Sequence, residues 1–256
     1  MYIVILSFIA LSSLLIWYLL KHDHGRKLPI GSLWLASGFG IIAVTLAWYL
    51  EQWLLPKDFA VASHSAGLGL TFLLFLAVGF LEEGVKFLPL AVFIYRKPYF
   101  KEHTDGVIYF AICGLTFGLS ENILYTVSLG AKAGIVRLVL TPFFHAAATS
   151  ILGYYLVSMK INHKVRLKFV LACLLVPVMH GLYDFGLSSG KLQLGVLSFM
   201  ITLLFSLGIF LYFMSANDLD KAALARATAC PNNFCKYCGR PNIRHAPFCE
   251  YCGHHL

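Results

Sequence analysis

The feature that most constrains this chain is a series of long apolar stretches with few charged residues. Seven of them are near or above the ~20 residues that an α-helix needs to cross the hydrocarbon core of a bilayer. They lie at residues 2–20, 29–50, 67–95, 106–128, 135–158, 167–187 and 193–215. The third is longer than a perpendicular crossing requires, so we expect it to tilt or to extend beyond the bilayer. The sequence predicts an all-α polytopic membrane domain of about seven transmembrane helices over residues 1–215.

The composition excludes an ordinary soluble domain. Charged residues make up only 12% of the chain, roughly half the fraction in soluble proteins. The net charge of +8 would suit a nucleic-acid partner, but the basic residues lie mostly in short loops between apolar stretches. There they set the orientation in the membrane. The expected surroundings are a lipid bilayer, and no nucleic acid is expected.

The distribution of basic residues predicts the orientation. The loops after the first, third and fifth stretches carry ten Lys and Arg residues, and the opposite loops carry four. Cytoplasmic loops are the ones enriched in these residues. We therefore expect a multi-pass protein with its N-terminus outside and its C-terminal tail in the cytoplasm. The first stretch has no evident cleavage site before Lys21, which favours a retained span over a signal peptide.

The tail has the spacing of a zinc ribbon. A linker at 216–230 leads to a Cys-rich unit at 231–256, which contains two Cys-x-x-Cys-Gly turns with ten residues between them. Each turn directs two thiolates at one metal, and four thiolates close a tetrahedral shell around a structural Zn²⁺. The four predicted ligands are Cys235, Cys238, Cys249 and Cys252.

Other assignments of the tail are possible. Two disulfides are disfavoured because thiols stay reduced in the cytoplasm. Cys230, His245, His254 and His255 are alternative ligands, but four well-spaced thiolates give them no necessary role. A ribbon of this size is a candidate contact site for a protein partner.

Ionisable residues inside the predicted spans carry the strongest functional signal. Each one at the centre of a bilayer helix costs at least ~2.5–3.5 kcal/mol on insertion scales, so such residues mark functional sites. They lie in four consecutive spans: Glu82, Glu83 and Lys86 in the third, Glu121 in the fourth, His145 in the fifth, and His180 and Asp184 in the sixth. A purely structural role is reasonable for any one of them, but less so for the set.

The spacing of these residues adds geometry. Both glutamates can approach Lys86 on one helix face, because they precede it by four and three residues. His180 and Asp184 are likewise four residues apart. The predicted topology puts all of these side chains between mid-membrane and the outer side, where they could line one cavity that opens outward. By contrast, Gly114-x-x-x-Gly118 is interpreted as a helix-packing motif.

The same residues belong to longer motifs. These are Glu82-Glu83-Gly-Val-Lys86-Phe; Asp105-Gly106-Val-Ile-Tyr109 with Phe117-Gly118-Leu-Ser-Glu121-Asn122-Ile-Leu-Tyr125; Phe144-His145-Ala-Ala-Ala-Thr149; and His180-Gly181-Leu-Tyr183-Asp184-Phe185. In order and spacing they resemble the conserved regions of the PrsW family of intramembrane proteases, which is related to the CAAX prenyl proteases and bacteriocin-processing enzymes. The resemblance covers residues 82–185 and leaves out the first two spans and the tail.

The resemblance implies an intramembrane endopeptidase of the bacterial plasma (inner) membrane. Its substrate would be a single-span membrane protein such as an anti-sigma factor, cleaved in regulated proteolysis. One position departs from the relatives: CAAX proteases carry Phe-x-x-x-His where this chain has Phe117-x-x-x-Glu121. The role of that histidine therefore does not pass to Glu121.

The nucleophile is expected to be a water molecule. Ser120 lies next to Glu121 but has no evident base. A glutamate, either Glu82 or Glu83, could act as general base. Alternatively, His145, His180 and a carboxylate could hold a zinc ion that activates the water. The candidate catalytic residues are Glu82, Glu83, Glu121, His145, His180 and Asp184, supported by Lys86 and Asn122.

A different class of function also fits buried carboxylates and histidines. Ion- or proton-coupled transporters use the same residue types within their membrane helices. The chain shows no paired inverted halves and no matched broken helices, which many transporters have. A purely structural or receptor protein would leave the number of buried charges without a reason.

Overall fold

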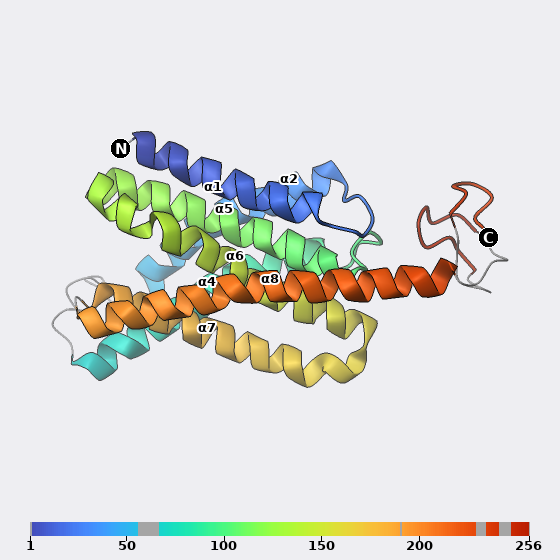
Figure 1. Ribbon diagram of the computed structural model, residues 1–256. Helices are drawn as coiled ribbons and strands as arrows, with labels where there is room; N and C mark the ends of the chain where they lie inside the picture. The colour runs from blue at the N-terminus through green and yellow to red at the C-terminus, as the bar shows by residue number, and fades with distance from the viewer. Residues whose placement is uncertain (1, 56–66, 190, 229–233, 241–246, 256) are drawn as a thin grey trace.

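Helices account for nearly all of the residues that the structure describes. The computed structural model describes residues 2–55, 67–189, 191–228, 234–240 and 247–255. Within these ranges the α-helices are α1 (Tyr2–Lys21), α2 (Ile30–Leu54), α4 (Leu68–Phe93), α5 (His103–Leu129), α6 (Ala131–Ile161), α7 (Arg166–Ser188) and α8 (Leu192–Thr228), and a 3₁₀ turn, η1 (His163–Val165), links α6 to α7. The predicted all-α class with seven long helices is confirmed (Figure 1).

The long helices meet the requirements for crossing a bilayer. Over the described residues, α1, α2, α4, α5, α7 and α8 are all long and apolar enough to span it. The helix α6 has 31 residues, which corresponds to about 46 Å at 1.5 Å per residue. Figure 1 shows the helices running roughly side by side along one direction, with the N-terminus and the C-terminal ribbon at opposite ends.

The helix α5 forms the centre of the bundle. Two thirds of its apolar window is buried, whereas the windows of the other candidate spans are 28–39% buried. It packs most extensively against α6 and also contacts α1, α2 and α8, while α4 packs against α7. The second and third candidate motif regions, on α5 and α6, are thereby held together at the core of the molecule.

Polar and apolar side chains are distributed as in a membrane protein. Large apolar residues face outward on several helices, including Trp34 on α2 and Leu204 on α8. In contrast, Lys86 has no exposed surface and Glu83 has almost none. Charged groups in the interior and bare apolar groups on the outside are expected when the solvent is lipid.

The last helix is longer than the sequence predicts. The apolar stretch ends at residue 215, but α8 continues without a break to Thr228 and includes most of the expected linker at 216–230. Its polar end is fixed by contacts with distant parts of the chain. The Asp220 carboxylate accepts hydrogen bonds from the backbone N–H groups of His103 and Thr104, both at 2.9 Å, and Asn217 accepts one from His24 at 3.0 Å. These bonds cap the start of α5 and secure the extension.

Candidate functional site

The charged residues of α4 form a buried ion-pair cluster. The Lys86 ammonium lies 2.6 Å from Glu83 Oε1 and 3.5 Å from Glu82 Oε2. All three side chains are buried. The predicted one-face arrangement is therefore present, with Glu83 as the closer partner.

His180 connects α7 to both glutamates. Its Nδ1 lies 2.8 Å from Glu83 Oε1, so Nδ1 carries the hydrogen and donates it to the carboxylate. Its Nε2 lies 3.3 Å from Asp184 Oδ2 and 3.5 Å from Glu82 Oε2. Glu83 thereby fixes the orientation of the ring, as a carboxylate does for a metal-binding histidine.

Three electron-rich atoms meet at this point. Glu82 Oε2 and His180 Nε2 are buried and make no hydrogen bond among the described residues. With the ring hydrogen on Nδ1, the lone pair of Nε2 faces the oxygens of Glu82 and Asp184. Such an arrangement requires a positive charge between the atoms, either a proton on Nε2 or a bound cation.

The donor set fits a metal ion. Glu82, His145 and His180 each offer one ligand atom, and these atoms lie within 4.8 Å of one another. Two histidines and one carboxylate are a known ligand set for catalytic zinc. The chemistry of the donors therefore agrees with the metal-dependent alternative.

His145 connects α6 to the same cluster and to α5. Its Nδ1 lies 3.1 Å from Lys86 Nζ, and its Nε2 lies 2.9 Å from Glu121 Oε2. Since the ammonium can only donate, Nδ1 accepts and Nε2 donates to the Glu121 carboxylate. Both ring nitrogens are thus engaged by protein groups in this arrangement.

Arg137 is a site residue that the sequence analysis missed. Its Nη2 donates to Glu121 Oε1 at 2.7 Å, and its Nε donates to Asn122 Oδ1 at 2.9 Å. The guanidinium also lies over the Tyr125 ring, 4.1 Å from the centroid. The available signal is the position of this arginine inside the predicted span 135–158. In the prediction of the orientation, Arg137 is one of the four basic residues assigned to the loops on the outer side.

Glu51 of α2 is a second residue that was not predicted. It lies within electrostatic range of Glu121, Asp184 and His180. It lies near the end of α2, just after the predicted span 29–50, so the sequence assigns it to a loop. No motif includes it.

Glycines set the distance between α4 and α7. A Cβ built on Gly79 would collide with the backbone of Pro177 and Gly181, and one built on Gly181 would collide with the backbone of Leu76. Gly79 precedes Glu82 by about one turn, and Gly181 directly follows His180. The close approach of the two backbones therefore brings the α4 carboxylates to the α7 histidine.

The Gly114-x-x-x-Gly118 motif has a more specific role than general packing. A Cβ on Gly114 would meet the backbone carbonyl of His145, and one on Gly118 would meet the His145 ring. The two glycines leave the space on α5 against which His145 packs. The prediction of a close-packing motif is consistent with this arrangement, and its partner is a candidate site residue.

The members of the cluster differ in their exposure. The side chains of Glu121 and Asp184 are each 16% exposed and that of Glu82 is 9% exposed, whereas Glu83 and the two histidines are at about 1%. All six predicted catalytic residues therefore come together, with Glu121 and Asp184 nearest the surface. The outward-opening cavity remains a prediction.

Ser120 is occupied elsewhere. Its hydroxyl donates to the Thr116 carbonyl one turn earlier on α5, at 2.8 Å. This bond within the helix supports water as the nucleophile.

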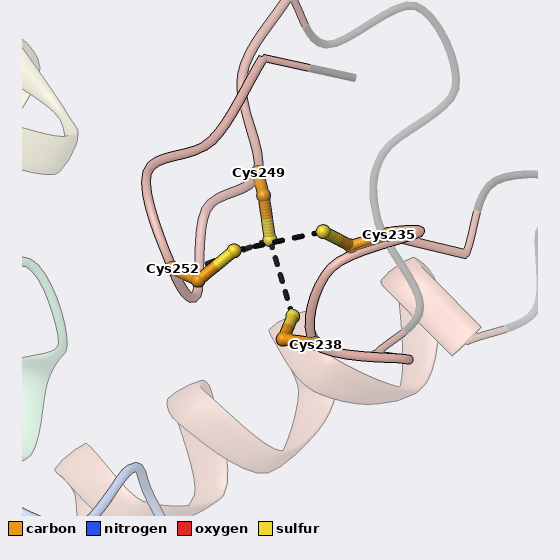
Figure 2. Close-up of side chains that lie close together, drawn as sticks. All are labelled: Cys235, Cys238, Cys249 and Cys252. Atoms are coloured by element: carbon orange, nitrogen blue, oxygen red, sulfur yellow. Dashed lines mark hydrogen bonds between the residues drawn. The ribbon is translucent and has the colours of Figure 1, made fainter.

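The tail cysteines form a second candidate metal site. Figure 2 shows four sulfur atoms pointing toward a common centre from two turns of the chain. The Sγ atoms are 3.5 Å apart for Cys235 and Cys252 and 3.6 Å apart for Cys238 and Cys249. Zinc–sulfur bonds of ~2.3 Å in a tetrahedron separate the sulfurs by about 3.8 Å. The cluster can therefore hold a metal ion, and its spacing is close to that of a zinc site.

The backbone of both turns has the conformation that a zinc knuckle requires. Gly239 and Gly253 have φ of +68° and +75°, which glycine adopts without a steric penalty. The backbone N–H groups of Tyr237 and Tyr251 point at Cys235 Sγ and Cys249 Sγ, each at 3.4 Å.

The alternative tail ligands are only partly described. The rings of His254 and His255 pack on Tyr237 and Phe248. Cys230 and His245 lie outside the described residues, as do 231–233 and 241–246 of the expected ribbon.

Most of the membrane part of the chain is similar to known proteins. Residues 28–214 match the family described as PrsW family intramembrane metalloprotease. The chain is 33% identical to Protease PrsW of Bacillus subtilis (strain 168) over 179 residues, which are 69% of this chain and 78% of that protein. It is 32% identical to Protease PrsW of Geobacillus kaustophilus (strain HTA426) over 173 residues, or 67% and 73% of the two chains. No solved structure matches.

Proposed function

This chain belongs to the PrsW family of intramembrane metalloproteases and is a multi-pass membrane hydrolase, and from that premise we propose which residues cleave the peptide bond. We propose that a water molecule is activated among Glu82, His145 and His180. The observation that carries the proposal is a group of three atoms that lie close together. His180 Nε2 lies 3.3 Å from Asp184 Oδ2 and 3.5 Å from Glu82 Oε2. Among the described residues, neither Glu82 Oε2 nor His180 Nε2 makes a hydrogen bond.

The two glutamates have different roles in this proposal. Glu83 is committed to Lys86 and to His180, at 2.6 and 2.8 Å. It orients the imidazole and does not exchange protons with substrate. Glu82 has an oxygen without a hydrogen bond, so it is the carboxylate that can take a proton from water or hold a cation.

The remaining polar residues position the histidines and conduct protons. Arg137 and Asn122 hold Glu121 against the His145 ring. Asp184 is the more exposed neighbour of His180 Nε2, so it is placed to pass a proton between that nitrogen and bulk water. In the version without metal, His180 Nε2 can then protonate the leaving amine.

A metal would be held by Glu82, His145 and His180, and His145 would bind it through Nδ1 in place of its contact with the Lys86 ammonium. Zinc bound there would lower the pKa of its water ligand to roughly 7 and polarise the scissile carbonyl. Without it, Glu82 is the general base. The family description as metalloproteases supports the first version.

Cleavage tests the residue assignments. Wild-type chain and variants are expressed with a single-span, membrane-anchored anti-sigma factor, which the family resemblance suggests as substrate. We expect Glu82→Gln and His180→Ala to reduce cleavage by ~100-fold or more. Ser120→Ala and the exposed Asp218→Asn serve as controls and should cleave normally. Unchanged cleavage by a membrane-inserted Glu82→Gln variant would contradict the assignment.

Metal counting distinguishes the two mechanisms. Elemental analysis of the purified full chain should give two zinc ions, one at the membrane site and one structural ion in the ribbon. His180→Ala should lose one, and Cys235→Ser with Cys249→Ser should lose the other. If the active chain holds one ion, and the ribbon substitutions remove it, then Glu82 acts as the base without metal.

We further propose that residues 1–215 form the catalytic membrane domain, with the ribbon at 231–256 on the cytoplasmic side and the N-terminus outside. The opposite positions of the two ends support this orientation (Figure 1). Green fluorescent protein fused to the C-terminus should fluoresce. A dark, full-length and membrane-inserted fusion would contradict the orientation.

A further inference from the structure

A groove outside the catalytic cluster lies between α6, the start of α7 and the second half of α8. It has a volume of about 450 Å³. Its walls include Tyr154, Tyr155 and Ser158 of α6, Lys168 of α7, and Gly208 and Tyr212 of α8. In Figure 1 the start of α7 diverges from α8 toward the end of the bundle that carries the ribbon.

The lining of the groove is suited to an anion attached to an apolar chain. Ser158 is 6% exposed, and its hydroxyl makes no hydrogen bond among the described residues. The phenol groups of Tyr155 and Tyr212 lie 2.9 Å apart. Lys168 supplies a positive charge, and no described lining residue is a carboxylate. Leu211, with 56% of its surface exposed, continues the wall as an apolar surface.

Two further basic residues lie close to Lys168 in the sequence. Lys164 and Arg166 are exposed and lie within four residues of Lys168. The neighbouring acid, Asp220, already accepts hydrogen bonds from the start of α5 and from the His103 ring. The local charge is therefore positive.

The size of the groove argues against a substrate helix as its occupant. A helix of 10–12 Å diameter and 5.4 Å pitch fills roughly 500 Å³ per turn. The groove would hold less than one turn, whereas a phosphate headgroup with part of an acyl chain fits. Tyrosine and lysine at the ends of membrane helices also mark the level of the lipid headgroups.

We propose that this groove binds one anionic phospholipid from the leaflet on the ribbon side. The phosphate lies between Lys168, Ser158 and the tyrosine hydroxyls, and an acyl chain lies along Gly208 and Leu211. Basic pockets between membrane helices bind acidic lipid headgroups in this way.

Native mass spectrometry of the full chain in detergent tests the site. With added phosphatidylglycerol we expect one lipid to be retained per chain, and about tenfold less retention with phosphatidylcholine. Lys168→Gln should weaken phosphatidylglycerol retention about tenfold, the loss of one charge-assisted hydrogen bond. Lys191→Gln, on an exposed lysine at the other end of the bundle, is the matched control and should retain the lipid.

A second pair of variants fills the groove. A Cβ on Gly208 would have Ile151 as its nearest neighbour at 3.8 Å, and a Cβ on Gly195 of the same helix would meet nothing within 4 Å. Gly208→Leu should therefore displace the lipid without a clash, and Gly195→Leu should not. Both variants should unfold at the wild-type temperature.

Three results would overturn the proposal. They are equal retention of phosphatidylcholine, displacement of the lipid by an equal concentration of inorganic phosphate, and full retention by both Lys168→Gln and Gly208→Leu. The readout is lipid mass, so the outcome does not depend on whether the chain cleaves a peptide.

Discussion

Lys86 is the residue around which the candidate catalytic cluster is assembled. Its ammonium contacts Glu83 and the His145 ring, and it lies 4.1 Å from the centroid of the Phe117 ring. These contacts come from three helices. A buried lysine with this many partners is stable only while its countercharges remain.

Replacing Lys86 tests this dependence. Lys86→Met leaves the Glu83 carboxylate buried without its ammonium, so we expect a loss of ~3–5 kcal/mol in unfolding free energy. Glu83→Gln added to Lys86→Met should restore part of that loss, because no uncompensated charge remains. Chemical denaturation in detergent measures both. Equal stability of the single and double variants would argue against a buried ion pair.

Arg137 offers a test of positioning. Arg137→Lys keeps the charge but cannot donate simultaneously to Glu121 and Asn122 through a planar fork. We expect a roughly tenfold loss of cleavage rate with little change in KM, since a small misplacement of the catalytic groups lowers turnover. Lys132→Gln, one turn earlier and exposed, is the control. A change confined to KM would point to substrate binding.

At the residue scale, the sequence singles out a residue where a motif names it. Glu82, His145 and His180 stand out because an ionisable side chain in an apolar helix is costly, and each lies in a motif. Arg137 and Glu51 stand near helix ends, where charged residues are common, and neither lies in a motif. Their partners on other helices are visible only in three dimensions.

At the scale of helices, the sites of closest approach decide the geometry. Each candidate catalytic histidine follows an internal proline by three residues, at Pro142 and Pro177. Proline removes one backbone hydrogen bond and bends a helix. The glycine contacts between α4 and α7 set the distance of His180 from the α4 carboxylates.

A substitution at the α4–α7 crossing should be costly. Gly79→Ala places a methyl group against the backbone of α7, so we expect ~1–3 kcal/mol of destabilisation and a larger relative loss of cleavage. Gly69→Ala in the same helix has open space around its Cβ and should be neutral. Thermal unfolding and cleavage of the two variants are compared side by side. Similar unfolding temperatures and cleavage rates of the two variants would mean that α4 and α7 can move apart at this crossing without a cost.

Apolar length predicted the cores of the helices but not all of their ends. The end of α8 is polar, so hydropathy alone assigns it to a linker. It is helical where Asn217 and Asp220 bond to residues more than a hundred positions away. Such long-range capping has no local pattern that a sequence could reveal.

At the scale of the whole molecule, the ribbon contacts the membrane domain through the loop before α5. The Lys101 ammonium donates to the backbone carbonyl of Glu250. Tyr99 and Lys101, together with Arg26 and the turn at Cys249–Gly253, line a recess of about 270 Å³. The ribbon therefore lies beside the loops that precede α2 and α5.

Loss of the ribbon metal should have a local effect. Cys235→Ser with Cys249→Ser removes two of four ligands, so we expect residues 234–255 to become sensitive to protease while the helices remain resistant. Limited proteolysis followed by mass spectrometry measures this. Cys173→Ala, outside the ribbon, is the control. A ribbon that stays resistant would contradict a fold that depends on metal.

The pairing of Lys86 within its own helix has a consequence for the order of synthesis. His145 follows Lys86 by 59 residues, and His180 follows Glu83 by 97. At ~5–20 residues per second, the ribosome needs about 5–20 s to add the last of these partners. At the start of that interval α4 contains two carboxylates and one ammonium, while α6 and α7 have not yet been synthesised. Lys86 is the countercharge that Glu83 has within α4 itself. The newly synthesised helix therefore enters the bilayer already partly neutralised.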